Sequence, residues 1–519
     1  MTDGELFVGL DLGTSSLKGV AVGAGGEVTA RARADYPTQR PEAGAAEQSP
    51  LDWWRALEQV VGALDDVGAP RARWAAVGLS GMIPTLVLAD EAGEPVAPAI
   101  TWEDARAEPE GETLRDRLGG ERLYALTGQW VDGRYLLPMF LRLARVAPQA
   151  ARRARLLLGA KDWLFLRLTG EAATDPSTAS GFGCYGLEAG SWLDEVNAAA
   201  AEELHATAHG ATPGGEPPRT LPALPAVLPS TAARPVAPAV AARLGLPAGL
   251  PVCVGGADSV LGCLGLGVEQ PGGVACIAGT STVLLGVADR LVIDPAHWYL
   301  ITPLAGVDGW GFEMDLLTTG SAVRWLAGLL RAAGGDEEAV MAMAARVPPG
   351  AGGLSFLPYL APGEQGALWD PLLSGSLLGL SLGHGAAEVA RALVDGIVLE
   401  MRRCLEVLEQ AGLPRGPVSV AGGSAVDQSF RRQLADACRR DVVYAASGES
   451  EYSAIGAAVL AAAAAGRGRP AAAPATVEAL MPDESRALVW DDLWERHEAA
   501  LRAVRVAGVG QQRQDRGHA

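Results

Sequence analysis

The feature that most limits the fold is a pair of short apolar segments joined by a Gly-Thr-Ser turn near the start of the chain. The apolar segments are Phe7–Leu12 and Leu17–Val22, and Gly13-Thr14-Ser15 lies between them. A glycine-rich turn then leads into a third short segment, Glu27–Ala32. Short apolar runs separated by such turns predict successive antiparallel strands.

The first turn has the side chains that a magnesium-bound polyphosphate requires. Glycine and small hydroxyl residues allow backbone N–H groups to approach phosphate oxygens closely. Asp11 can hold the metal ion through its water shell, and Lys18 can offset negative charge. For this segment alone, the alternative is an ordinary surface hairpin in which Asp11 supports the turn and Lys18 is solvated.

A second copy of the pattern favours the phosphate-binding interpretation. Gly273–Val287 again contains two apolar segments, and Gly279-Thr280-Ser281 lies between them. Two such hairpins indicate a duplicated fold.

A proline-rich stretch between the two copies, residues 206–251, predicts a domain boundary. We predict an N-terminal domain over 1–249, a C-terminal domain over 250–481, and a C-terminal helix with a disordered tail over 482–519. A long surface loop within one domain is the alternative for the proline-rich stretch.

Composition narrows the classes of partner. The net charge of −19 disfavours binding to nucleic acid or to an anionic membrane. The six cysteines include no Cys-x-x-Cys pair, which indicates reduced thiols in a cytoplasmic protein. The N-terminus lacks the pattern of a signal peptide, and the alanine-rich run at 454–465 is too short to span a bilayer. We therefore expect a cytoplasmic protein without a membrane anchor.

Strands and helices alternate in the second half. The apolar residues of Glu388–Ala411 recur at helical spacing, and Gly412 and Pro414 follow as a stop signal. A strand is predicted over 417–421, a helix over 429–440 and a last helix over 493–506. The polar residues 508–519 are predicted to be disordered.

Asp258 is the candidate catalytic base. It follows a buried apolar segment and a glycine turn and stands at the predicted start of a helix. In phosphoryl transfer the protein mainly positions groups and stabilises charge, and a carboxylate accepts the proton of the attacking hydroxyl. On local sequence alone, a role as helix N-cap is an equal alternative.

Gly422-Gly423-Ser424 presents backbone without large side chains, on which a flat base could rest. Asp427 is close enough in sequence to help fix a nucleotide. A plain strand-to-helix turn is the alternative for an isolated Gly-Gly pair.

Together these residues resemble the FGGY carbohydrate kinases, a branch of the actin and hexokinase-like ATPase superfamily that includes xylulokinases, gluconate kinases and glycerol kinases. The resemblance covers roughly residues 6 to 465. The matching motifs are Asp11-Leu12-Gly13-Thr14-Ser15, Gly279-Thr280-Ser281, Ala421-Gly422-Gly423-Ser424, Asp258 in its glycine turn, and Phe356-Leu357-Pro358-Tyr359-Leu360 with Gly363-Glu364.

The resemblance implies an α/β fold with two ribonuclease H-like domains, and ATP with Mg²⁺ in the cleft between them. By similarity, Asp11 lies by the magnesium ion, and Thr280 and Gly320 lie along the phosphates. Gly423 and Asp427 lie near the nucleotide. Closure of the cleft around an acceptor would exclude water from the reaction.

Trp102, Asp104 and Arg106 resemble the Trp-x-Asp-x-Arg element near the sugar pocket of xylulokinase-like members; a solvated surface turn is the alternative. Met82 and Ser259 are further candidate acceptor contacts. Ser80-Gly81-Met82-Ile83 occupies the place of the Gln-Met-His that xylulokinases usually have, and only Met82 agrees. Isoleucine cannot supply the hydrogen bond of histidine.

Two further positions depart from the usual pattern. Ser259 replaces an asparagine and Gln365 replaces a common arginine. These departures leave the acceptor open.

The implied function is an ATP-dependent kinase that phosphorylates a hydroxyl of a small sugar or polyol, with a ketopentose such as xylulose as the first candidate. The alternatives are another acceptor such as gluconate or a pentitol, a non-metabolic actin-like ATPase, and a degenerate kinase that binds sugar without phosphorylating it. A small molecule is the expected partner. The oligomeric state is left open, with a homodimer as one option.

Overall fold

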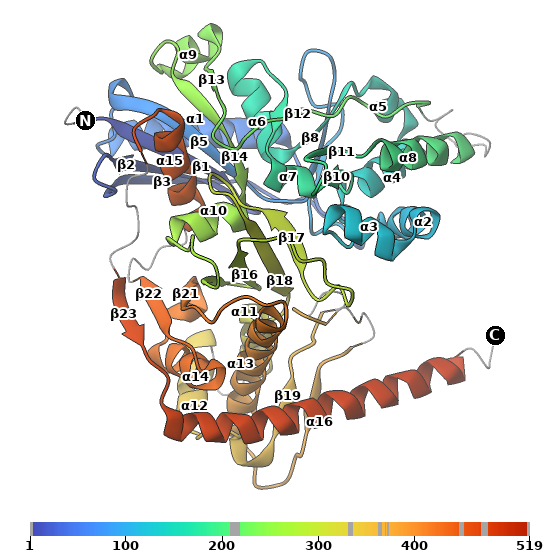
Figure 1. Ribbon diagram of the computed structural model, residues 1–519, viewed down its shortest axis with the longest axis vertical. Coiled ribbons are helices and arrows are strands. Elements are labelled where there is room, and N and C mark those ends of the chain that lie inside the picture. Colours follow the sequence, from blue (N-terminus) through green and yellow to red (C-terminus); the bar gives the residue numbers. More distant parts are fainter. Residues whose placement is uncertain are drawn as a thin grey trace.

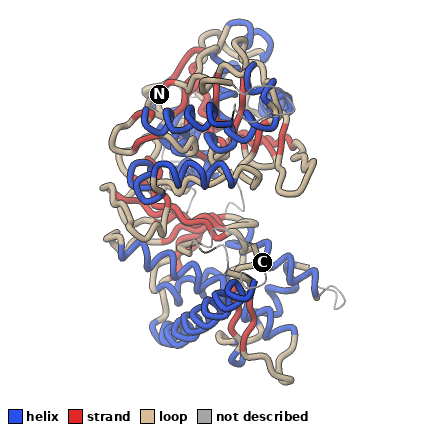
Figure 2. Tube along the Cα trace, turned by 90° about the vertical axis from the view of Figure 1, so that its right-hand side faces the viewer, coloured by secondary structure: helices blue, strands red, loops and turns tan. Residues whose placement is uncertain are grey.

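The computed structural model describes residues 4–207, 218–330, 336–361, 366–368, 370, 373–445, 451–468 and 476–515. The chain forms two α/β lobes, each built around a central β-sheet (Figure 1). A view turned by 90° shows the same two lobes one above the other (Figure 2).

The sheet of the first lobe has six strands in the order β13-β14-β5-β1-β2-β3. In chain order these strands are β1 Leu6–Leu12, β2 Ser16–Gly23, β3 Val28–Asp35, β5 Trp74–Gly81, β13 Ala233–Pro235 and β14 Pro251–Ala257. Strands β1, β2 and β3 are antiparallel, whereas β1, β5 and β14 run parallel to one another. The three antiparallel strands predicted at the start of the chain are confirmed.

The sheet of the second lobe repeats this topology in the order β17-β18-β16-β15-β21-β22-β23. Its strands are β15 Val274–Ala278, β16 Thr282–Ala288, β17 Leu300–Pro303, β18 Trp310–Leu316, β21 Val418–Ala421, β22 Val442–Ala445 and β23 Thr476–Leu480. Strands β15, β16 and β18 are antiparallel, and β15, β21 and β22 are parallel. The two sheets therefore have equivalent cores, as the two Gly-Thr-Ser hairpins predicted.

Strand β1 has no polar side chain before Asp11, because helices cover both faces of its sheet. Helix α1 (Pro50–Asp66) packs on β2 and β3, and its side chains share a core with Val8 and Leu10 of β1. Phe7 points to the opposite face and shares a core with helix α15 (Tyr452–Ala464). Alternating residues of a strand point to opposite faces, so a strand buried on both sides is a continuous apolar run.

Helix α15 lies on the sheet of the first lobe although it comes late in the chain (Figure 1). Two glycines allow the helix backbone to approach this closely. A Cβ atom on Gly9 would lie 1.8 Å from the carbonyl oxygen of Ala454, and one on Gly78 would lie 2.0 Å from that of Ala457. The run predicted to be too short for a bilayer is thus part of the protein core.

The first lobe continues beyond the predicted boundary at 249/250. Strand β14 is hydrogen-bonded between β13 and β5 in the first sheet, and helix α10 (Asp258–Gly265) packs against α15. We propose that the domain boundary lies between α10 and β15. Proline content did not locate it because the stretch before β14 supplies an edge strand of the first sheet.

An inserted region of the first lobe holds most of the remaining helices. It contains a four-stranded sheet with the order β4-β7-β6-β8 and its own hydrophobic core. Its main elements are β4 Glu47–Gln48, β6 Leu86–Ala89, β7 Ala99–Ile100, α2 Glu108–Leu118, α3 Gly120–Thr127, α4 Leu136–Val146, α5 Pro148–Arg153, β8 Leu156–Gly159, α6 Ala160–Thr169, α7 Pro176–Ser180 and α8 Asp194–Thr207. Two strand pairs, β9 Ala173–Thr174 with β12 Ala226–Val227 and β10 Tyr185–Gly186 with β11 Ser191–Trp192, and helix α9 Pro238–Leu244 complete the lobe.

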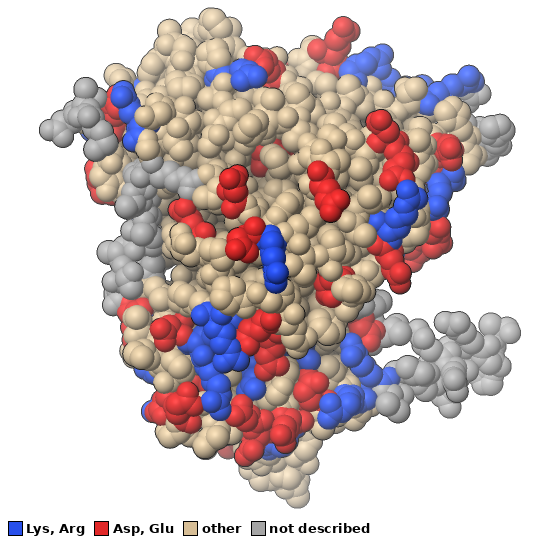
Figure 3. Space-filling view, viewed as in Figure 1, with Lys and Arg blue, Asp and Glu red and all other residues tan. Residues whose placement is uncertain are grey.

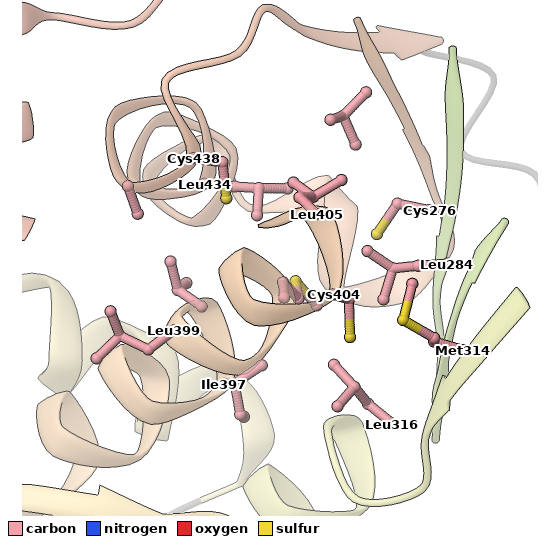
Figure 4. Close-up of a cluster of buried hydrophobic side chains, with 14 of the residues drawn as sticks. Cys276, Leu284, Met314, Leu316, Ile397, Leu399, Cys404, Leu405, Leu434 and Cys438 are labelled. Atoms are coloured by element: carbon pink, nitrogen blue, oxygen red, sulfur yellow. The ribbon is translucent and has the colours of Figure 1, made fainter. Parts of the chain in front are cut away.

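Helices pack against the sheet of the second lobe around a second core. They are α11 Gly320–Leu329, α12 Glu337–Ala345, α13 Ala386–Gln410 and α14 Gln428–Cys438, with the hairpin β19 Ser355–Leu357 and β20 Ser376–Leu378. The helices predicted over 388–411 and 429–440 are confirmed as α13 and α14. Figure 4 shows Cys276, Cys404 and Cys438 among the apolar side chains of this core. All six cysteines are buried free thiols.

The last helix is longer than predicted at both ends. Helix α16 spans Glu484–Asp515, whereas the sequence predicted 493–506 and a disordered segment from residue 508. The difference at the C-terminal end arises because polar residues can continue a helix that its first turns have anchored.

A buried polar cluster anchors α16 to the second lobe. The carboxylate of Glu400 on α13 accepts hydrogen bonds from Tyr359 at 2.7 Å and from Arg403 at 3.0 Å, and its Oε1 lies 2.5 Å from Nε2 of His497. Burial opposes ionisation of Glu400, but Arg403 and His497 outweigh it and lower its pKa to about 2. The helix is thus held by a charge-assisted network.

Among the residues that the structure describes, no helix is both long and apolar enough to cross a bilayer. On the face shown in Figure 3, arginine side chains of the second lobe lie among acidic ones.

Candidate active site

Hydrogen bonds to its carbonyl groups fix the first Gly-Thr-Ser turn. The N–H of Gly13 donates to the carbonyl of Ser16 at 3.1 Å. The hydroxyl of Tyr36 donates to the carbonyl of Gly13, and Nε2 of Gln48 donates to the carbonyl of Thr14 at 2.7 Å. The turn residues themselves are half-buried or exposed, so a ligand can reach them.

Asp11 is buried at the end of β1, beside this turn. It pairs in register with Lys18 of β2 and with Ser80 of β5, and the hydroxyl of Ser80 donates to its carboxylate at 2.7 Å. Burial raises the pKa of Asp11, while the charge of Lys18 and the hydrogen bond from Ser80 act in the opposite direction. A buried carboxyl group whose ionisation is disfavoured in this way would be stabilised by a nearby cation.

The second Gly-Thr-Ser turn packs against the start of helix α11. The N–H of Ser321 donates to the carbonyl of Thr280 at 2.9 Å, and the N–H of Gly279 donates to that of Ser281 at 2.8 Å. A Cβ atom on Gly320 would lie 2.3 Å from the carbonyl oxygen of Gly279, so only glycine allows this approach. The structure thus brings Gly279, Thr280 and Gly320 together.

Asp258 stands at the corner where β14 ends and helix α10 begins. The N-cap residue of α10 is Ala257, so Asp258 does not have the capping role considered from the sequence. Gly255 has a φ of +83°, and a Cβ atom there would lie 1.7 Å from the carbonyl oxygen of Leu79. Burial, and then the nearby charge of Asp11, raise the pKa of Asp258 to about 8.

A pocket lies between the lobes and is here called the interlobe pocket; Asp258 does not line it, but the charge of one lining residue, Asp315, acts on Asp258. Its polar lining comprises Trp102, Gln129, Arg134, Tyr135, Thr302, Glu313 and Asp315, and its apolar lining includes Ile83, Pro84 and Leu300. The hydroxyl of Ser259 donates to Oε2 of Glu313 at 2.8 Å. This hydrogen bond connects the helix that carries Asp258 to the wall of the pocket.

Glu313 and Asp315 were missed from the sequence, as were Gln129 and Arg134. Burial is the main cause that raises the pKa of Glu313 to about 8 and that of Asp315 to about 6, and Arg134 opposes the shift of Asp315. Two acidic residues at alternate positions of an apolar strand do indicate locally that one face of the strand is polar, because their side chains share that face. Nothing local shows that this face meets the other lobe.

Gln129 is held in place by its neighbours. Its Nε2 donates to the carbonyl of Ile301 in the second lobe at 2.8 Å, and its Oε1 accepts from the hydroxyl of Tyr135 at 2.8 Å. The amide therefore bridges the two lobes at the pocket wall.

Met82 is not among the residues that line the interlobe pocket. Its side chain is 1% exposed and lies in the hydrophobic core of the first lobe, and its N–H donates to the carbonyl of Leu12 at 2.9 Å. The next residue, Ile83, lines the pocket instead. The side chain that departs from the xylulokinase pattern is thus the one that lines the pocket.

Trp102 links the pocket to the first Gly-Thr-Ser turn, because its indole N–H donates to the hydroxyl of Thr14 at 3.2 Å. Asp104 and Arg106 instead hold the loop that carries Trp102. The carboxylate of Asp104 accepts from the N–H of Ala46 at 2.9 Å and from the guanidinium of Arg106 at 2.7 Å.

The guanidinium of Arg106 reaches three carboxylates, those of Asp104, Glu42 and Glu47. We expect Arg106→Lys to raise KM for the acceptor by about tenfold, because a single ammonium group cannot replace the fork and Trp102 would be less well placed. Steady-state kinetics would measure the change. Arg142→Lys is the matched control, since Arg142 also contacts Glu42 at 3.2 Å but does not hold Asp104. An unchanged KM in Arg106→Lys would contradict the expectation.

The Gly-Gly turn of the second lobe leaves open space beside it. Gly422 has a φ of +94°, and a Cβ atom on it would lie 2.4 Å from the carbonyl oxygen of Ala278. A Cβ atom on Gly423 would meet nothing within 4 Å, so its backbone can face a flat ring. Asp427 is the N-cap of α14, and its Oδ1 accepts from the N–H of Phe430 at 2.8 Å.

Comparison with known proteins identifies this arrangement. Residues 6–265 match the N-terminal domain of the FGGY family of carbohydrate kinases, and residues 274–465 match its C-terminal domain. The chain belongs to the FGGY family of carbohydrate kinases. It is therefore a phosphotransferase with an alcohol group as acceptor, of a family whose kinases use ATP. The gap between the two matched ranges agrees with a boundary between α10 and β15.

Relatives of this FGGY kinase have different names. It is 29% identical to the xylulose kinase of Escherichia coli (strain K12) over 86% of this chain and 87% of the relative. It is 27% identical to the gluconokinase of Bacillus subtilis (strain 168), over 88% and 86%. It is 30% identical to the glycerol kinase of Alkalilimnicola ehrlichii, over 97% and 98%. These identities leave the acceptor unresolved.

Solved structures agree with the two-lobed fold of this FGGY kinase. The crystal structure of xylulose kinase from Rhodospirillum rubrum superposes with a TM-score of 0.84 at 28% identity, and the match covers 97% of this chain and 100% of that one.

Proposed function

We propose that this FGGY kinase transfers the γ-phosphoryl group of ATP, with Mg²⁺, to a hydroxyl of a small uncharged sugar or polyol, and that a ketopentose such as xylulose is the first acceptor to test. The observation that carries the proposal is the place of Asp258. It lies close enough to Asp11 at the first phosphate turn for the two charges to interact, and it adjoins Ser259, which contacts the interlobe pocket.

The residues present fit a magnesium ion. Asp11 is buried, and burial disfavours its ionisation. Its negative charge also repels that of Asp258. A divalent cation would stabilise the ionised form of Asp11 and reduce this repulsion. Asp11 would hold the ion through its water shell. When bound, the ion would neutralise part of the negative charge of the phosphates.

The phosphates and the base would be held by backbone groups of both lobes. The turn residues Gly13, Thr14 and Ser15 would face the terminal phosphates, and Lys18 would offset their charge. Gly279, Thr280, Ser281 and Gly320 would face the phosphates from the second lobe. Gly422 and Gly423 would support the adenine ring, and the second carboxylate oxygen of Asp427 would help to fix the nucleoside.

Asp258 would accept the proton of the acceptor hydroxyl as the new P–O bond forms. Its raised pKa means that the carboxyl group keeps its proton near neutral pH in the unliganded enzyme. Because only the ionised form accepts a proton, kcat/KM for the acceptor should rise with pH on its acidic limb. A cation bound at Asp11 would move that limb to lower pH.

The charge of the interlobe pocket favours an uncharged acceptor. Glu313 and Asp315 lie in its wall, and Arg134 is already bonded to the carboxylate of Asp132 at 2.8 Å. An aldonate such as gluconate would bring another carboxylate into a buried wall where ionisation of Glu313 and Asp315 is already disfavoured, at an electrostatic cost. The side chains Glu313, Asp315 and Gln129 have acceptor oxygens for sugar hydroxyls.

A coupled assay of ADP release tests the proposal with acceptors that differ in charge. Xylulose, xylitol, sorbitol and glycerol would be compared with xylonate and gluconate. We expect phosphorylation of at least one uncharged acceptor, with kcat/KM about tenfold or more above that of the aldonate of equal carbon number. Preference for gluconate would contradict the pocket argument and favour an aldonate kinase.

The same assay separates the remaining alternatives. ADP release that no acceptor stimulates indicates an actin-like ATPase. Sugar binding by calorimetry without ADP release indicates a degenerate kinase. Either result would overturn the proposed function.

A further inference from the structure

A fully buried cluster of charges lies behind the strand ends that carry the site. Lys161, at the start of α6, lies with its Nζ atom 2.9 Å from Oδ1 of Asp162 and 3.0 Å from Oδ1 of Asp175, and all three side chains are 0% exposed. The chain has only two lysines, and the other is Lys18 at the phosphate turn. A buried group of paired charges contributes little net stability by itself. We therefore look for the role of this cluster in the residues that it contacts.

The cluster connects to the helix of Asp258 through one serine. Asp175 is the N-cap of α7, and its Oδ2 accepts from the N–H of Ser177 at 2.9 Å and from the Ser177 hydroxyl. The hydroxyl oxygen of Ser177 in turn accepts from the N–H of Ala257 at 2.9 Å. Ala257 directly precedes Asp258 and is the N-cap of α10.

The direction of these hydrogen bonds is fixed by chemistry. The backbone N–H of Ala257 can only donate, so the hydroxyl of Ser177 must accept there and donate its own proton to Asp175. Asp175 is then the acceptor, and its other carboxylate oxygen lies 3.0 Å from the ammonium group of Lys161. The hydrogen bonds from Ala257 through Ser177 and the ion pair from Lys161 thus converge on the carboxylate of Asp175.

The corner between β14 and α10 needs such support. The pairing of β14 with β5 shifts register between Cys253 and Gly256, next to the positive φ of Gly255. The N–H of Ala257 lies beyond this irregularity. Its partner is a side chain that the inserted region supplies rather than a strand.

The same cluster lies against the end of β5. A Cβ atom on Gly81 would lie 2.8 Å from Cβ of Lys161, so glycine is required for α6 to pack there. The preceding residue, Ser80, donates to Asp11. One rigid block thus supports the strand ends beside both Asp11 and Asp258.

We propose that Ser177, oriented by Asp175 and Lys161, is a positioning residue for Asp258. This inference rests on the proposed role of Asp258 as the base. The hydrogen bond from Ala257 to Ser177 fixes the position of the backbone just before Asp258. It therefore fixes the position of the Asp258 carboxylate relative to the acceptor hydroxyl. Displacement of a catalytic group by about 1 Å can cost about 100-fold in rate.

Ser177→Ala and Ser180→Ala form a matched pair. Both serines are 1% exposed on α7, but the hydroxyl of Ser180 bonds only to the carbonyl of Pro176 in its own helix, at 3.2 Å. We expect Ser177→Ala to lower kcat by about 10- to 100-fold with KM for ATP unchanged, and Ser180→Ala to stay within about twofold of the parent enzyme. The acidic limb of the pH–rate profile should also move in Ser177→Ala alone.

Crystal structures of both variants give a readout that does not depend on activity. The Asp258 carboxylate should be displaced by about 0.5 Å or more in Ser177→Ala and unmoved in Ser180→Ala. An unmoved carboxylate in Ser177→Ala, or equal rate losses in the two variants, would overturn the inference. If the parent enzyme phosphorylates no acceptor while the carboxylate still moves, the proposed function fails and the positioning of Asp258 by Ser177 stands.

Discussion

Asp258→Asn is expected to lower the rate of sugar phosphorylation by about 10²- to 10⁴-fold, with little change in the affinity for ATP. Asparagine keeps the shape of the side chain but cannot accept the proton of the acceptor hydroxyl. The coupled assay measures the first effect and nucleotide titration the second. Asp436→Asn is the matched control, because burial also raises the pKa of Asp436 but it lies on α14, where it accepts from the N–H of Asp483.

The same substitution should stabilise the ligand-free fold. The pKa of Asp258 is raised to about 8, so its ionisation opposes folding, and the stability it removes grows as pH rises toward that value. Asparagine has no charge to repel Asp11, and we expect the free energy of unfolding at pH 8 to increase by about 1 kcal/mol or more. Urea unfolding at pH 6 and pH 8 measures this. An active Asp258→Asn enzyme would exclude Asp258 as the base, and an unchanged stability would exclude the electrostatic conflict.

Lys161→Met is expected to lower the free energy of unfolding by about 3–5 kcal/mol at pH 8. The substitution keeps the volume of the side chain but leaves Asp162 and Asp175 buried without their cation. Burial already raises the pKa of Asp162 above its ordinary value. Without Lys161 the carboxyl group of Asp162 would hold its proton to higher pH, and its ionisation would oppose folding. The loss should therefore shrink as pH falls toward 5.

Lys18→Met is the control for Lys161→Met. Lys18 is half-buried on β2 and its charge favours ionisation of Asp11. We expect its substitution to change the free energy of unfolding by less than about 1 kcal/mol and to weaken phosphate binding instead. Chemical denaturation at two pH values measures both variants. A similar decrease in the free energy of unfolding in the two variants would contradict the role of Lys161 as the cation that pairs with Asp162 and Asp175. A decrease in Lys161→Met that does not depend on pH would contradict it as well.

The two Gly-Thr-Ser hairpins were predictable from local chemistry. A Gly-Thr-Ser turn between apolar strands is recognisable in sequence because the strand period and the turn residues are local properties. Asp258 could be singled out because a glycine turn and a helix start surround it. The alternation of strands and helices in the second half was predictable for the same reason.

The acceptor side was predicted less well because it depends on which elements meet. Met82 and Ile83 are adjacent, and only tertiary packing, including that of α6 against β5, decides that Met82 enters the core and Ile83 lines the pocket. Asp104 and Arg106 were expected at the sugar, but Glu42 and Glu47 from a distant segment engage Arg106.

The sequence by itself determined the duplicated strand pattern, the two Gly-Thr-Ser turns and the chemical identity of the candidate base, since each depends on residues that are neighbours in the chain. Tertiary structure alone decided that α15 completes the first lobe, that Glu313 and Asp315 of the second lobe wall the pocket, and that Ser177 supports the corner at Asp258. The physical reason is that desolvation and charge interaction depend on distance in space, and the partners in these contacts are tens to hundreds of residues apart along the chain.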